Sequence, residues 1–194
     1  MATRSFTADE GIPGGIGPID RLPAGAGRFL RYQLDVIAST TEDVLQCAGG
    51  WLCDRARAGW DVNVLVADGA DPRPLAIVGA TALDRDEGFL AMVRSASRVG
   101  ALAVSADLLA ADVRVRAEIL RILKRGLTEV IVCGKQWPAE LGGHADPVPH
   151  RVSPAARAFK SHALIAANIS TDSVSPTETL FRVGTGALRQ LRSV

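Results

Sequence analysis

The fold is decided by residues 30–66, whose sequence is LRYQLDVIASTTEDVLQCAGGWLCDRARAGWDVNVLV. Apolar and polar side chains alternate over residues 30–36, which predicts a strand with one buried face. The STTE sequence at 39–42 then has the pattern of a helix capping box, and Gly59 is placed to end that helix. Residues 61–66 have the apolar content of a second strand. A strand, a helix and a strand within this length indicate a right-handed βαβ unit.

The rest of the chain continues to alternate between strand and helix patterns. Further strands are expected at residues 75–78, 101–104 and 129–133, and helices at 85–97, at 110–125 and from Pro154 onward. The segment before 75–78 is too short for a parallel crossover, so we expect that strand to form an antiparallel hairpin with the strand before it. Residues 179–184 fit either a short helix or an edge strand, because their β-branched and glycine content contradicts the capping signal before them.

These patterns define the domain organisation. Residues 1–27 are rich in glycine and proline and are predicted to be a flexible tail. Residues 28–194 are predicted to form a single α/β domain, with a long loop at about 134–153 that contains no periodic signal. We expect a three-layer α/β sandwich with a mixed, mostly parallel sheet of about five or six strands.

Composition excludes several classes of protein. The chain has 194 residues and a formal charge of +1, so net charge does not favour nucleic acid or an anionic membrane as a partner. It contains no apolar run long enough for a membrane helix and no signal-peptide pattern, from which we expect a cytoplasmic protein. Its three cysteines lack a Cys-x-x-Cys spacing, which argues against a disulfide framework and a structural zinc site.

The sequence contains no catalytic motif of known mechanism. There is no Walker A loop, no dinucleotide-binding glycine pattern after the first strand, no Gly-x-Ser-x-Gly elbow and no His-Glu-x-x-His. Ordinary ATPases and standard dinucleotide dehydrogenases are therefore disfavoured, and the sequence names no cofactor. His144, Asp146 and His150 include metal-ligating side chain types, but their spacing matches no metal motif, so we assign no metal site.

Candidate ligand-binding residues follow the expected strands. The expected hairpin would place the strand ends at two edges of the sheet, which gives two candidate sites. The preferred site contains Thr81, Ser105, Asp107, Lys135 and Trp137. There Lys135 is the expected partner of an anion, Asp107 a hydrogen-bond acceptor or general base, and Trp137 a covering surface. The second candidate is an anion site made by Ser39, Thr40, Thr41 and Asp68 at a helix N-terminus.

Two functions of different classes are compatible with these residues. The leading hypothesis is a cytosolic domain that binds a small anionic molecule, phosphorylated or not, with or without catalysis. The alternative is a non-enzymatic regulatory or scaffold module that contacts a protein partner through Arg114, Arg121 and Arg125, which share one polar face of the helix at 110–125. Nucleic acid is disfavoured as a partner because no aromatic residue interleaves that face. Homo-oligomerisation is an open alternative.

Overall fold

The structure is a computed structural model that describes residues 32–67, 71–83, 100–126, 128–171 and 174–183, all within one compact unit, Arg31–Val194. The tail expected at 1–27 and the helix expected at 85–97 lie outside the described residues. Those residues form a seven-stranded sheet in the order β3-β2-β1-β4-β5-β7-β6. The strands are β1 (Gln33–Ala38), β2 (Asp61–Val66), β3 (Thr81–Leu83), β4 (Gly100–Ser105), β5 (Glu129–Cys133), β6 (Pro147–Arg151) and β7 (Thr177–Val183).

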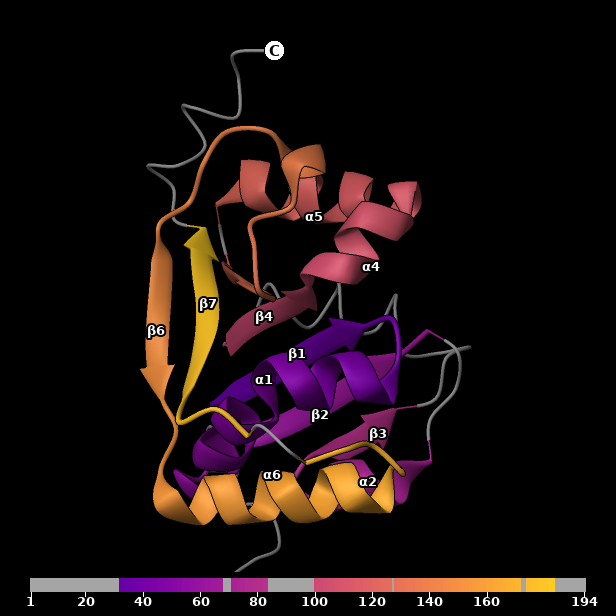
Figure 1. Cartoon of the computed structure of the whole chain (residues 1–194). Helices are drawn as coiled ribbons and strands as arrows, with labels where there is room; N and C mark the ends of the chain where they lie inside the picture. Colours follow the sequence, from indigo (N-terminus) through magenta and orange to yellow (C-terminus); the bar gives the residue numbers. More distant parts are fainter. Residues whose placement is uncertain (1–31, 68–70, 84–99, 127, 172–173, 184–194) are drawn as a thin grey trace, which may run out of the picture. The chain divides into compact units, whose positions relative to one another are not determined.

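Strand direction divides the sheet into two parts. Strands β1 to β5 are all parallel. At the centre of this parallel part, Val36 of β1 pairs with Val64 of β2 and with Ala103 of β4. β7 is antiparallel to β5, and β6 is antiparallel to β7. The predicted mixed, mostly parallel sheet is therefore confirmed, with slightly more strands than expected (Figure 1).

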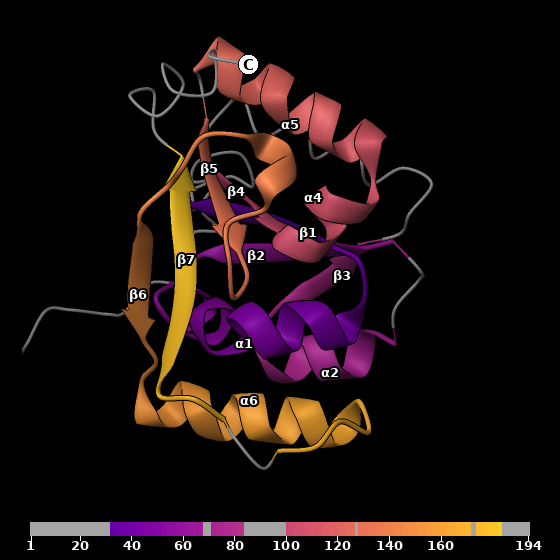
Figure 2. The same cartoon turned by 45° about the horizontal axis from the view of Figure 1, so that its top comes forward.

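Helices cover both faces of the sheet and complete the three layers (Figures 1 and 2). On one face lie α1 (Thr41–Arg57), α2 (Pro72–Ile77) and α6 (Pro154–Ala166), around a core that includes Leu45, Leu52 and Leu75. On the other lie α4 (Ala106–Ala111) and α5 (Val113–Arg125), around a core that includes Leu109, Ile119 and Val132. A short 3-10 helix, η1, spans Ala139–Leu141.

The strand expected at 75–78 is wrong, because these residues belong to α2 and to the turn after it. Asp71 caps α2 by accepting a hydrogen bond from the Arg73 N–H, and Pro72 occupies the first helical turn, where its missing N–H costs nothing. A short apolar run fits a buried helix as well as a strand. With α2 as the connection, β3 returns parallel to β2, so the expected hairpin is also wrong.

The long loop expected at 134–153 is wrong in part, since it contains η1 and β6. β6 is the edge strand of the sheet, the place where prolines such as Pro147 and Pro149 are tolerated. In the undecided segment at 179–184, residues 179–183 belong to a strand, β7, which lies between β5 and β6 and is not at the edge, whereas residue 184 lies outside the described residues.

One helix prediction also needs correction. The helix expected at 110–125 is divided into α4 and α5 at Asp112, whose side chain accepts hydrogen bonds from the N–H groups of Arg114 and Val115. Its end at Gly126 is confirmed, with a positive φ of 64°. In α6, Ser153 is the N-cap before Pro154, as expected. The buried face of α6 consists of Ala156, Lys160, Ala163 and Leu164.

A buried ion pair joins α6 to β7 and to the middle of α1. Lys160 and Glu178 are each 4% exposed, and Lys160 Nζ lies 2.6 Å from Glu178 Oε1. Glu178 also accepts hydrogen bonds from the Gly50 N–H at 2.8 Å and the Trp51 N–H at 2.7 Å, and Lys160 Nζ donates to the Gln46 carbonyl at 2.7 Å. Both charges are therefore satisfied by groups of the α1 backbone.

The two adjacent glycines of α1 have different roles at this contact. A Cβ on Gly50 would lie 2.5 Å from Val152 Cγ1. Only glycine therefore leaves room for Val152, which lies in the segment between β6 and α6. A Cβ on Gly49 would make an ordinary contact with Lys160 Cγ at 3.5 Å. Glycine is thus required sterically at 50 and is replaceable at 49.

We predict that alanine substitutions separate these roles. Gly50→Ala should lower the free energy of unfolding by about 1–3 kcal/mol, because Val152 and Glu178 must move to admit the methyl group. Gly49→Ala, the matched control, should leave stability unchanged or raise it by up to about 1 kcal/mol, since alanine is the better helix former. Urea unfolding followed by circular dichroism measures both, and equal destabilisation by the two would contradict the assigned contact.

Removing one member of the ion pair should cost more than removing both charges. Lys160→Met leaves the Glu178 carboxylate buried without its counter-charge and should destabilise the fold by about 3–5 kcal/mol. Adding Glu178→Gln removes that charge and should recover part of the loss. Urea unfolding of the single and double variants measures the difference, and a double variant less stable than Lys160→Met would be the opposite of this expectation.

Candidate functional site

The carboxyl ends of the five parallel strands meet at one edge of the sheet. The expectation of sites at two separate edges is therefore wrong, since it depended on the hairpin that the structure lacks. From β1 the chain enters α1 on one face, whereas from β4 it enters α4 on the other. β1 and β4 are neighbours, so the space between their carboxyl ends is a topological switch point, where open α/β sheets bind ligands (Figure 2).

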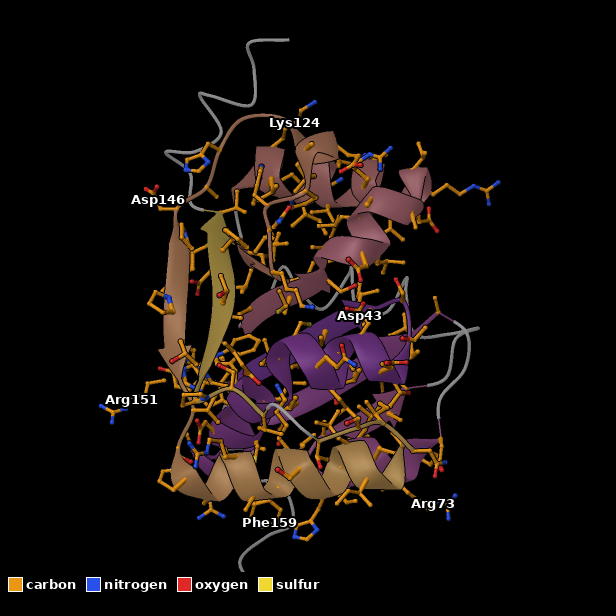
Figure 3. The ribbon with its side chains drawn as sticks, in the orientation of Figure 1. Asp43, Arg73, Lys124, Asp146, Arg151 and Phe159 are labelled. Atoms are coloured by element: carbon orange, nitrogen blue, oxygen red, sulfur yellow. The ribbon has the colours of Figure 1, made fainter. Side chains whose placement is uncertain are left out.

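Asp43 is the central charged residue at this point (Figure 3). It lies in the first turn of α1, where its N–H donates to the N-cap hydroxyl of Thr40 at 3.1 Å. Its carboxylate accepts a hydrogen bond from the Ser39 N–H at 3.4 Å, and the polar side chains of Ser105 and Cys47 lie beside it. Burial raises the pKa of Asp43 above its usual range, and the nearby Asp107 carboxylate raises it further against those hydrogen bonds.

Four side chains form what we call the switch-point cluster: Asp43, Cys47, Ser105 and Cys133. Asp43 and Cys47 lie four residues apart on α1 and so share one face of that helix. Ser105 and Cys133 are register partners at the ends of β4 and β5. The Ser105 side chain lies beside Asp43, and the Cys47 thiol lies beside the Cys133 thiol. This thiol contact, with burial, raises the pKa of Cys47 well above its ordinary value.

The structure brings together only part of the preferred predicted site. Ser105 and Asp107 lie beside Asp43, and Lys135 is exposed just after β5 on the same edge. Thr81 is the first residue of β3, not the residue that follows it, so it lies at the opposite edge. The Trp137 indole donates to the Gly142 carbonyl at 3.1 Å and packs edge-on against Phe181, which anchors the loop after β5.

The second predicted site is placed at the start of α1. Thr40 is the N-cap, with Ser39 and Thr41 partly buried on either side of it. Asp68 lies outside the described residues. Glu42 and Asp43 put two carboxylates in the first helical turn, where they already complement the helix dipole and would repel a second anion.

Asp43, Cys47 and Cys133 were not selected from the sequence as site residues. The only local signal was the i, i+4 spacing of Asp43 and Cys47 directly after the capping box. Cys133 is far away in the chain and joins them only through the order of the strands.

His144 and His150 contact different carboxylates. The exposed His144 ring lies 3.4 Å from Asp146, whereas His150 Nε2 lies 2.9 Å from Asp54 on α1. Within the described ranges, no group of three or more His, Cys, Asp or Glu side chains is arranged to hold a metal ion.

Asp54 joins β6 and α6 to α1. Besides the His150 contact, it accepts a hydrogen bond from the Ser153 N–H at 3.1 Å. Burial alone would raise the pKa of Asp54, but the hydrogen bonds from Ser153 and His150 outweigh it and lower the pKa below its usual value.

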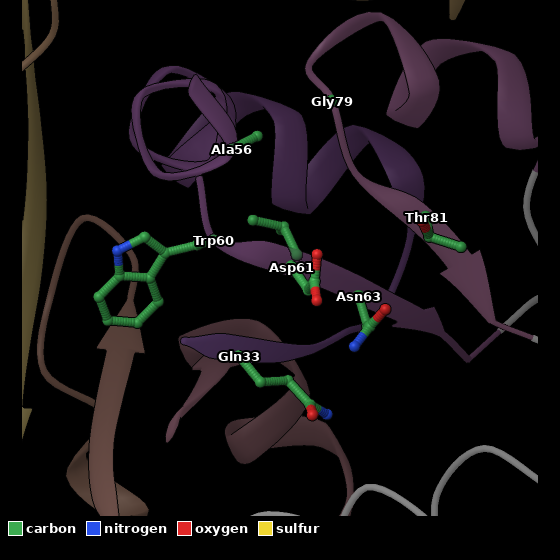
Figure 4. A pocket seen from close by; sticks show the side chains of 8 residues that line it. Gln33, Ala56, Trp60, Asp61, Asn63, Gly79 and Thr81 are labelled. Carbon is green, nitrogen blue, oxygen red and sulfur yellow. The ribbon is translucent and has the colours of Figure 1, made fainter. Parts of the chain in front are cut away.

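A polar hollow of about 430 Å³ lies at the opposite, amino edge of the sheet (Figure 4). Its lining includes Gln33, Trp60, Asn63 and Thr81. The amide nitrogens of Gln33 and Asn63 donate to the buried Asp35 carboxylate at 2.8–2.9 Å, which turns their amide oxygens away from it. The hollow is thus separated from the switch point by the length of the strands.

The three arginines proposed for a protein partner are all exposed on α5. They lie opposite the buried residues Val115 and Ile119. Arg121 pairs with Glu118, one turn before it.

Comparison with known proteins identifies the fold. The sequence matches no family model and no curated protein sequence. One similar solved structure is described as the zinc-inhibited form of teicoplanin deacetylase Orf2, with 12% identity and a TM-score of 0.52 over 77% of this chain and 97% of that one. Another is a deacetylase–teicoplanin complex from the teicoplanin biosynthesis pathway, with 11% identity and a TM-score of 0.52 over 78% and 98%. These similarities confirm the α/β architecture. Among the described residues, no helix has both the length and the apolar character to cross a membrane.

The opposite pKa shifts of Asp43 and Asp54 predict opposite effects of amidation. The lowered pKa of Asp54 stabilises the fold above the ordinary value of 3.8, and this contribution is lost as the pH falls through its folded-state pKa. The raised pKa of Asp43 has the opposite effect on stability. As the pH rises from 3.8 past the raised pKa, ionisation of Asp43 lowers the free energy of unfolding.

At pH 7 we therefore expect Asp54→Asn to lower the free energy of unfolding by about 1–3 kcal/mol. Asp43→Asn should leave it unchanged or raise it, and the effect of Asp54→Asn should shrink toward pH 3. Urea unfolding at both pH values provides the measurement. If Asp43→Asn were the more destabilising variant at pH 7, the two electrostatic assignments would be reversed.

Proposed function

We propose that this chain binds a small polar molecule at the carboxyl edge of its sheet, over the switch-point cluster, with Asp43 as the central binding group. One observation supports this most directly: a partly buried carboxyl group with a raised pKa lies at the topological switch point. Perturbed carboxyl groups in such positions are frequent at functional sites, because burial and a neighbouring like charge tune them for hydrogen bonding or proton transfer.

The charges at this edge define the chemistry of the proposed ligand. Asp43 and Asp107 would repel a ligand that is anionic throughout, whereas an ionised Asp43 accepts a hydrogen bond from a hydroxyl or amine. The exposed Lys135, after the neighbouring strand β5, provides a positive charge for a phosphate or carboxylate group. We therefore propose a ligand with a hydroxyl or amine at one end and an anionic group at the other.

Asp43 is also the residue suited to move a proton at this site. A carboxyl group with a raised pKa takes up and releases protons closer to neutral pH than an ordinary aspartate. Both solved structures named above are deacetylases of teicoplanin, and at 11–12% identity they support the architecture of this chain. The ligand proposed here is argued from the residues of this edge alone.

A thermal-shift screen tests the proposal with sugar phosphates, amino sugar phosphates, nucleotides and hydroxy acids. A compound that binds only the folded chain at about 100 times its Kd adds about 2.7 kcal/mol and raises Tm by several degrees. We expect such a shift in the wild type to be lost in Asp43→Asn and reduced in Lys135→Ala.

Asp146→Asn is the matched control, because it removes an exposed carboxylate that contacts only His144 among the described residues. It should retain the full shift. Hits that Asp43→Asn leaves unchanged would overturn the proposed site. A flat screen of well-folded protein would favour the alternative, a module that contacts a protein partner through Arg114, Arg121 and Arg125.

A further inference from the structure

The thiols of Cys47 and Cys133 meet at the base of the switch-point cluster although 86 positions separate them in the chain. The Cys47 side chain packs against the core cluster that contains Cys133, and its thiol donates to the Val44 carbonyl at 3.8 Å. Cys133 and Asp43 are the titratable groups beside it. Cys133 is at the end of β5 on the sheet face that α1 covers. The contact therefore joins the second turn of α1 to the strand end beside Ser105.

The two cysteines differ in their access to solvent. Cys47 is partly buried, whereas Cys133 is only 1% exposed. A soluble oxidant therefore reaches Cys47 first, and Cys133 can react with the product because its sulfur already lies against that of Cys47. Cys53, the third cysteine, is also buried on α1, and no thiol is among the groups that shift its pKa.

We propose that Cys47 and Cys133 are an oxidation site that forms a reversible intrachain disulfide between α1 and β5. With a peroxide as oxidant, the Cys47 thiolate attacks one peroxide oxygen and the O–O bond breaks, which leaves a sulfenic acid on Cys47 and releases water. The Cys133 sulfur then attacks the Cys47 sulfur, the S–O bond breaks, and a second water leaves. The two thiols lose two electrons and two protons in total, and hydrogen peroxide is reduced to two molecules of water.

The positions of the two sulfurs favour the disulfide over further oxidation. Sulfenic acid is trapped by a neighbouring thiol, and here that thiol is already in contact. A disulfide requires the two sulfurs to approach to about 2.05 Å, so its formation draws the side chains of α1 and β5 toward each other. The raised pKa of Cys47 keeps the thiolate scarce at neutral pH, so the reaction should accelerate as the pH rises.

Oxidation also changes the surroundings of Asp43. The Cys47 thiol is one of the groups that lower the pKa of Asp43, and a disulfide sulfur has no proton to offer that carboxylate. The disulfide therefore removes a donor from the proposed binding carboxylate while Ser39 and Ser105 remain. The thiol chemistry itself does not depend on the proposed ligand.

Peptide mapping without reduction tests the proposal on the full chain treated with hydrogen peroxide. Trypsin releases Cys47 and Cys53 together on residues 32–55 and Cys133 on residues 126–135. We expect these two peptides to be joined, to separate after reduction, and to leave one alkylatable thiol in the unfragmented protein. Cys53→Ala, the matched control, should still form the link and leave no free thiol.

Cys47→Ala and Cys133→Ala should both abolish the link, and circular dichroism shows whether each variant is folded. Wild-type protein that keeps three free thiols, or that gains a sulfinic acid on Cys47 while Cys133 stays free, would overturn the proposal. So would a link that survives in folded Cys47→Ala. The carboxyl ¹³C shift of Asp43 followed against pH should then show a higher pKa in the oxidised protein, and an unchanged pKa would refute the coupling to Asp43.

Discussion

The buried pair of Lys160 and Glu178 is the contact on which the arrangement of the other elements depends. It joins three elements that are distant in sequence, because both charges complete their hydrogen bonding on the backbone of α1. Burying two charges costs several kcal/mol per ion unless hydrogen bonds satisfy both. The strand β7 and the helix α6 can therefore take their places only when α1 presents the backbone around Gly50, where no side chain keeps Val152 at a distance.

The position of the switch-point cluster follows from that constraint. Lys160 and Glu178 hold α1 at its centre, and Asp54 holds its last turns through His150 and Ser153. The first two turns of the helix then extend over the ends of β4 and β5. At the same strand ends the chain after β5 passes close to the start of α4, where a Cβ on Gly134 would lie 2.6 Å from the Cβ of Ala106. The contacts that stabilise the fold thus also determine which groups meet at its carboxyl edge.

Local sequence patterns predicted most of the parallel core but not its long-range contacts. The strands near 61–66, 101–104 and 129–133 and the capped start of α6 were correct, because periodicity and capping are local properties. The capping box of α1 was predicted one residue too early, since Thr40 and not Ser39 is the N-cap. The run at 75–78 was misread because its length suits either a strand or a helix, and that one error created a false hairpin and a second site. No local sequence pattern predicts that Lys160 is buried, because its burial depends on Glu178, which belongs to a strand further along the chain.

The site was predicted only in part for the same reason. Ser105 and Asp107 follow a strand that the sequence predicts. Asp43 becomes a site residue only because the order of the strands places Ser105 beside it, and Cys47 only because that order places Cys133 beside it. These contacts make one network, so the groups at the cluster cannot act independently. A ligand that requires an ionised Asp43 binds better when the Cys47 thiol donates to that carboxylate. Because linkage is reciprocal, the same ligand favours the reduced thiols by an equal factor and so protects them from oxidation.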